Sequence, residues 1–195
     1  MSFKSLFAAA AVAAVLVAPS LAQAAFQRES QGVTFTITVT DATAGQFTLH
    51  IEDLLDATGN WAAVTQIGAL QFGDLGQDYS VTGSTLSPGS TTPFEEELNE
   101  NGCTGGVSPG HICFAFSPLF QASNDMTFQI DLNGPITVGA DGPHLKVNFY
   151  NAAGEQIGDL LSKNLPGTEV PEPGTVALLG LGLLGAPFLI RKKAR

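Results

Sequence analysis

Apolar and polar residues alternate strictly in four stretches of the chain. Between residues 33 and 40, every odd position is Val, Phe or Ile and every even position is Thr. The stretches 47–52, 126–132 and 145–150 follow the same period of two. Because successive side chains of a strand point to opposite faces of a sheet, each stretch predicts a β-strand with one buried and one solvated face.

Turn-forming residues separate the strands. The sequence Asn-Ala-Ala-Gly at 151–154 predicts a hairpin between 145–150 and a further strand at 156–161. A turn at 56–60 precedes an apolar run at 61–67, which predicts another strand. Short antiparallel strands with Gly and Pro between them are typical of a β-sandwich, so the predicted fold class is an all-β antiparallel sandwich.

One segment favours a helix instead. Thr92 is followed by Pro93 and, three residues after the Thr, by Glu95, which is the pattern of a capping box with Pro at the first helical position. A short helix that ends by residues 101–102 is therefore expected. The preceding residues 83–92, rich in Ser, Thr, Gly and Pro, are expected to form a surface loop.

The first 24 residues have the organisation of a secretory signal peptide. Lys4 supplies a positive charge, residues 6–17 are apolar, and Ala-Gln-Ala at 22–24 fits the small-residue cleavage pattern. The predicted cut lies between Ala24 and Ala25. The apolar region is too short to favour an uncleaved membrane anchor.

The C-terminal end contains a second membrane signal. Residues 174–190 carry no charge, and a helix of that length would span roughly 26 Å, enough to cross a thin bilayer. The basic cluster that follows consists of Arg191, Lys192, Lys193 and Arg195. Such clusters stay on the cytoplasmic side, so a C-terminal transmembrane helix is predicted, with the preceding residues outside the inner membrane.

This tail resembles the PEP-CTERM sorting signal of Gram-negative bacteria. The motif is matched residue for residue by Pro171, Glu172 and Pro173. The membrane span and basic end of that signal are matched by 174–190 and 191–195, so the resemblance covers only the tail. It implies recognition by an exosortase, cleavage near the motif, and transfer of the domain 25–170 towards the cell surface or an exopolysaccharide matrix.

A rival sorting signal precedes the motif. The sequence Leu-Pro-Gly-Thr-Glu at 165–169 is similar to the sortase motif Leu-Pro-x-Thr-Gly. Glu169 replaces the final Gly at the position that borders the sortase cut. We therefore interpret this similarity as a chance match.

Charge and cysteine usage narrow the class of the domain 25–170. All acidic residues but Glu172 lie within it, against Arg28, Lys146 and Lys163 as the only bases, which leaves a formal net charge of −14. This charge argues against nucleic acid as a partner.

Export to an oxidising compartment predicts a disulfide between Cys103 and Cys113, in preference to a metal site that would add His111.

Candidate catalytic residues are sparse. Residues 106–110 fit the pattern G-x-S-x-G, with Ser108 at its centre, but that nucleophile elbow needs a strand before it and a helix after it. Pro109 does not start such a helix, and His111 lies too near in sequence to be a conventional partner. His50 and His144 are interpreted as solvated residues of strands. No enzymatic activity is expected.

Two binding alternatives stay open. Asp53, Asp56, Thr58 and Asn60 place oxygens near one turn, although they lack the pattern of an EF-hand, so a loose Ca²⁺ site is an alternative to the absence of any metal or cofactor. Trp61 and Tyr79 would stack on a sugar if exposed, whereas burial of Trp61 would favour a structural role.

The sequence as a whole predicts an exported, non-enzymatic surface or matrix protein. The resemblance to the PEP-CTERM signal further implies that it is anchored transiently in the inner membrane, processed by an exosortase, and associated with exopolysaccharide in a biofilm. The alternative is a carbohydrate- or Ca²⁺-binding β-sandwich module.

Overall fold

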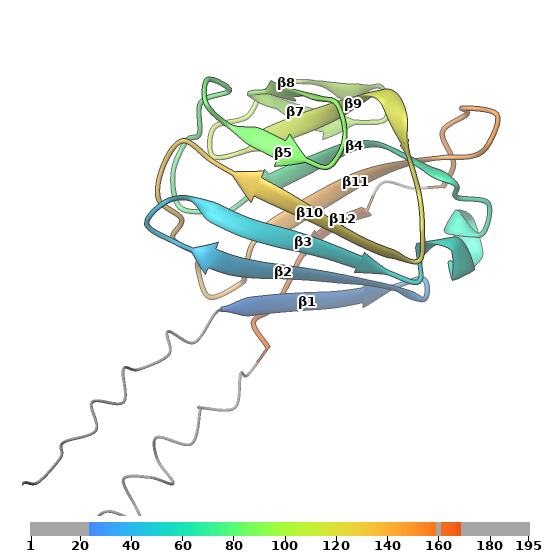
Figure 1. Ribbon diagram of the computed structural model, residues 1–195, viewed down its shortest axis with the longest axis horizontal. Helices are drawn as coiled ribbons and strands as arrows, with labels where there is room; N and C mark the ends of the chain where they lie inside the picture. The colour runs from blue at the N-terminus through green and yellow to red at the C-terminus, as the bar shows by residue number, and fades with distance from the viewer. Residues whose placement is uncertain (1–23, 159–160, 169–195) are drawn as a thin grey trace, which may run out of the picture. The chain divides into compact units, whose positions relative to one another are not determined.

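The computed structural model describes residues 24–158 and 161–168, which form two antiparallel five-stranded sheets and a separate hairpin (Figure 1). Sheet A contains, in spatial order, β1 (Ala25–Ser30), β2 (Val33–Asp41), β3 (Gln46–Glu52), β10 (Asp125–Asp131) and β5 (Thr85–Ser87). Sheet B contains β12 (Leu161–Asn164), β11 (His144–Tyr150), β4 (Gln66–Gly73), β9 (Ile112–Gln121) and β6 (Thr91–Phe94). The hairpin pairs β7 (Glu96–Asn99) with β8 (Gly102–Val107).

The four alternating stretches form β2, β3, β10 and β11, and the predicted all-β sandwich is confirmed. In each of these strands, the apolar side chains all point to the inner face of the sheet. Phe35 and Ile51, for example, are partners in neighbouring strands and are both fully buried. Such residues form the contact between the two sheets. For example, the ring centroid of Phe47 on β3 lies 4.9 Å from that of Phe72 on β4. Aromatic packing of this kind stabilises the core between the sheets.

The hairpin β7–β8 covers the outward face of sheet B. Leu98 and Cys103 of the hairpin are buried together with Ala69 of β4 and Cys113 of β9, in a second, smaller apolar cluster. In Figure 1 the hairpin lies beside β9, at the far side of the molecule from β1. Sheet A has no such cover within the described residues, and its outward side chains are half-buried or exposed.

The predicted short helix after Thr92 is wrong. The segment forms strands β6 and β7 instead. Pro93 has no N–H to donate, but β6 is the edge strand of sheet B, where a Pro is tolerated. The Glu95 carboxylate accepts a hydrogen bond from the backbone N–H of Val81 (3.3 Å) and does not cap a helix.

Three further boundaries differ from the sequence-based expectations. The expected loop at 83–92 contains β5 and the start of β6. Trp61 belongs to a short 3₁₀ helix (Gly59–Trp61) that follows another at Leu54–Asp56, and the next strand begins only at Gln66. The hairpin partner of β11 is β12, which begins at Leu161, later than predicted.

Helical structure in the described part of the chain is confined to these 3₁₀ turns. Among residues 24–158 and 161–168, no helix is long and apolar enough to cross a membrane. The predicted signal peptide up to residue 23 and the predicted transmembrane helix lie outside the described residues.

Candidate functional site

The two ends of the described domain lie side by side. The backbone N–H of Gln27 donates to the Pro166 carbonyl (3.1 Å), and that of Thr168 donates to the Ala25 carbonyl (2.9 Å). The Thr168 hydroxyl donates to the same carbonyl (3.0 Å), so residues 166–168 continue sheet A beyond β1. The predicted N-terminal cleavage site and the residues just before the predicted sorting motif therefore meet at one corner of the domain.

The predicted leader cut coincides with the start of sheet A. Ala24 is exposed, but its carbonyl accepts a hydrogen bond from Val39 (3.0 Å). Ala25 is the first residue of β1 and pairs with Thr38. A cut between Ala24 and Ala25 would thus leave β1 whole.

The Leu-Pro-Gly-Thr sequence is held within the fold. Leu165 is fully buried, and its N–H donates to the Pro143 carbonyl (2.9 Å). Gly142 allows this close approach, since a Cβ at that position would lie 1.7 Å from the Leu165 carbonyl oxygen. Leu165 is therefore part of the core, whereas residues 166–168 are exposed.

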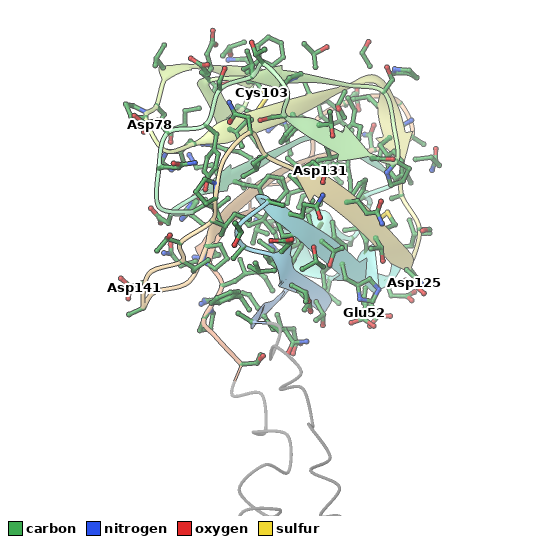
Figure 2. The ribbon with its side chains drawn as sticks, turned by 60° about the vertical axis from the view of Figure 1, so that its left-hand side comes forward. Glu52, Asp78, Cys103, Asp125, Asp131 and Asp141 are labelled. Carbon is green, nitrogen blue, oxygen red and sulfur yellow. A yellow bond between two sulfur atoms is a disulfide. The ribbon has the colours of Figure 1, made fainter. Side chains whose placement is uncertain are left out.

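Cys103 and Cys113 lie at bonding distance. Their sulfur atoms are 2.05 Å apart, and they join β8 of the hairpin to β9 of sheet B (Figure 2 labels Cys103). The structure describes no free cysteine. The bond pins the hairpin to the face that it covers.

A charged pair and a buried amide hold the same hairpin. Lys146 of β11 donates to the carboxylate of Glu97 in β7. This hydrogen bond, together with the charge of Lys146, lowers the pKa of Glu97 below its ordinary value. The side chain of Gln71 is fully buried and accepts a hydrogen bond from the N–H of Leu98 (2.6 Å).

Two residues of the elbow-like pattern and its flank, Ser108 and His111, come together in the structure. Ser108 Oγ lies 3.0 Å from His111 Nδ1, in a turn between β8 and β9. A strand, not a helix, follows the serine, so the context of a nucleophile elbow is missing. No described residue forms a hydrogen bond with His111 Nε2, and the ring rests on Gly73, where a Cβ would lie 2.3 Å from the imidazole carbon.

A hollow of about 550 Å³ opens beside this turn, at the rim where β4 ends and β9 begins. Asp74, Asp78 and Asp141 line it, together with His111 and Asn164. Figure 2 shows Asp78 and Asp141 on separate loops at this side of the domain. The carboxylates are exposed, and the described residues contain no group of His, Cys, Asp and Glu that could hold a metal ion.

The oxygens of the proposed Ca²⁺ turn serve other contacts. Asp56 accepts a hydrogen bond from the Asn124 amide (2.6 Å), and the Thr58 hydroxyl donates to the Gln31 carbonyl (3.1 Å). Asp53 adopts a left-handed conformation (φ 62°) that starts the first 3₁₀ turn. These contacts tie the turn at residues 53–60 to Asn124 and to Gln31.

Both candidate sugar-stacking rings are buried. Trp61 is 2% exposed, and its ring lies 4.7 Å from that of Phe149. Tyr79 is 3% exposed, and burial raises its pKa to about 12. Its hydroxyl lies within hydrogen-bond distance of the carbonyl oxygens of Leu75 (2.7 Å) and Pro135 (3.0 Å). Neither ring is available to stack on a ligand.

Comparison with known proteins identifies the tail. Residues 169–193 match the family model of the PEP-CTERM protein-sorting motif, so the predicted signal is confirmed. This motif implies export, transient membrane anchoring and processing by an exosortase. The chain is thus a PEP-CTERM domain-containing protein. The match leaves the described domain unassigned, and Pro171 to Pro173 and the basic cluster lie outside the described residues.

Other comparisons add little. The comparison with curated proteins gave no match. Among solved structures, the chain is similar to one described as "pH-induced modulation of Streptococcus parasanguinis adhesion by Fap1 fimbriae". The identity is 9%, the TM-score is 0.37, and the alignment covers 80% of this chain and 96% of that one. A similarity at this level carries no argument about this chain.

Proposed function

We propose that this chain is an exosortase substrate whose β-sandwich domain is a non-enzymatic structural protein of the cell surface or extracellular matrix, associated with exopolysaccharide in a biofilm. The observation that carries the proposal is the sorting motif at residues 169–193. The compact all-β domain that precedes it would be the cargo.

The described domain supports a structural role. Trp61 is buried in the core, which is the outcome that favours a structural role, and Tyr79 is buried as well. Ser108 and His111 form a pair through Nδ1, whereas conventional serine catalysis uses the Nε2 atom and an acid that orients the ring. Together these features favour a scaffold over a hydrolase.

Processing provides the first test. Replacing Pro171 and Pro173 by Ala should leave the protein in the inner membrane with its tail intact, and a Pro109→Ala control should be sorted normally. The measurement is the intact mass of the protein in membrane, surface and medium fractions. Surface material that keeps residues 174–195 would contradict exosortase processing.

Deletion of the gene tests the role of the domain. Cell aggregation or matrix properties should change, and a Ser108→Ala variant should restore them. A hydrolytic activity of the exported protein that Ser108→Ala abolishes would overturn the structural assignment.

A further inference from the structure

Among residues 24–158 and 161–168, no element covers the outward face of sheet A, which is rich in hydroxyl groups and which we call the open face. Its outward residues include Thr34, Thr36, Thr38 and Thr40 of β2, Thr48 of β3 and Thr127 of β10. Within the described residues, none of these six hydroxyls forms a hydrogen bond with another part of the chain. Their bonding capacity is therefore directed outward, whereas the equivalent face of sheet B is closed by the hairpin.

The strand register arranges these groups in rows. Thr38 pairs with Thr48, which is the partner of Gln129 on the next strand, and Thr36 stands in the same way beside His50. Neighbouring strands lie about 4.8 Å apart, and same-face residues of one strand about 6.7 Å apart. The open face therefore repeats its donors and acceptors in two directions.

One end of the open face is hollowed. A depression of about 340 Å³ crosses β2, β3 and β10. Its polar lining consists of Thr40, Gln46, Thr48, Gln129 and Asp131. Hydroxyl and amide side chains both donate and accept hydrogen bonds, so this lining suits a ligand that carries hydroxyl groups itself.

Charge restricts the ligand further. The pairing places Glu52 beside Asp125 at one end of the open face, and Asp131 stands towards the other end (Figure 2). The strands β2, β3 and β10 contain no Lys or Arg. An acidic polymer would therefore be repelled at both ends. His50 lies in the row of Thr36 and Thr127, but its ring is paired within the acidic end, with Nε2 2.8 Å from Asp125 and Nδ1 3.9 Å from Glu52. The threonine and glutamine side chains beside it carry no charge and can accept a neutral polymer.

We propose that the open face binds a neutral polysaccharide chain through hydrogen bonds to its threonine and glutamine side chains. One sugar unit of that chain would lie in the depression that crosses β2, β3 and β10. This inference rests on the proposed function and gives it a site and a ligand class. Because no aromatic ring stacks on the sugar, each contact is weak, and binding depends on many contacts made at once. Long chains should therefore bind, and single sugars should not.

The test compares two triple variants of the full chain purified in detergent. Thr36, Thr38 and Thr48 are changed to Val, which keeps the branched Cβ and replaces the hydroxyl with a methyl group. The control changes three exposed threonines elsewhere, Thr82, Thr92 and Thr137, to Val. Binding is measured by the retardation of each protein in native gels that contain hydroxyethylcellulose, a neutral polymer, or alginate, an acidic one.

The wild type and the control should be retarded by hydroxyethylcellulose and not by alginate. The open-face variant should bind about tenfold more weakly or worse, since each lost hydrogen bond contributes about 0.5–1.5 kcal/mol. Equal retardation of all three proteins, or retardation by alginate alone, would overturn the proposal. Equal retardation would mean that the threonines serve only the strand preference of their β-branched side chains.

Fractionation of the producing cells separates this inference from the proposed function. A wild type that is absent from the surface and matrix contradicts the proposed function. An open-face variant that is retained in the matrix as well as the wild type contradicts the inference alone. Loss of the variant from the matrix, with normal tail processing, is the expected result.

Discussion

Reduction of the Cys103–Cys113 bond should weaken the domain by a calculable amount. The two cysteines are 10 residues apart in sequence, and closing a loop of that size lowers the entropy of the unfolded chain. The loop-entropy relation gives about 2.7 kcal/mol at 25 °C. The value describes the bond alone, with the apolar contacts of Leu98 in the hairpin taken as unchanged by reduction.

Urea unfolding of the exported protein, followed by the fluorescence of Trp61, measures the effect. With a slope of about 2 kcal/mol per M, reduction should lower the midpoint by roughly 1.3 M. A variant with both cysteines changed to Ala should unfold at one midpoint in oxidising and reducing buffer alike.

Equal midpoints for the oxidised and reduced wild type would refute this reasoning. Labelling of thiols in the unfolded, unreduced protein distinguishes the causes. If no thiol reacts, the bond forms but the unfolded chain is already restricted by other contacts. If two thiols react, the bond is absent, and the metal site with His111 becomes the alternative to examine.

Two further substitutions test the core and the hairpin. Trp61→Ala should lower the free energy of unfolding by about 3–5 kcal/mol, because the ring is buried against Phe149. Thermal unfolding followed by circular dichroism measures this loss, and a value below about 1 kcal/mol would contradict the burial. Glu97→Gln should cost less than about 1 kcal/mol at pH 7, because the Glu97 side chain is 45% exposed and Gln keeps an oxygen that can accept from Lys146, whose own side chain is 13% exposed. Since Lys146 lowers the pKa of Glu97 in the folded state, the wild type's advantage over this variant should be full above the ordinary value of 4.5 and disappear on further acidification. An advantage that grows in acid would show that the sign is wrong.

The accuracy of the sequence-based prediction followed the environment of each strand. β2, β3 and β10 face the core on one side and water on the other, so their alternation was visible in the sequence. β9 is covered on both sides, by the core and by the hairpin, and its apolar run Ile112 to Phe116 shows no period. Strands buried on both faces are not distinguishable by periodicity alone.

One wrong prediction and two features that the sequence did not reveal have physical causes. The residues around Pro93 satisfy a helix-start pattern, but pairing of β6 with β9 outweighs that local preference. Ser108 and His111 meet because a tight turn reverses the chain between them, which a search for a helix cannot detect. The burial of Tyr79, by contrast, depends on long-range contacts with Pro135 that leave no local signal.

The pairing at the start of β1 sets an order of events in time. If the leader is cut between Ala24 and Ala25, as the sequence predicts, the bond to be broken lies beside a carbonyl that the folded domain engages through Val39. Ala25 is held on its other side by Thr168. A protease that binds its substrate as an extended strand would have to displace Val39 and Thr168 from these carbonyls once sheet A has formed. On that premise, the leader would be removed from the unfolded, emerging chain, before residues 166–168 pair with β1.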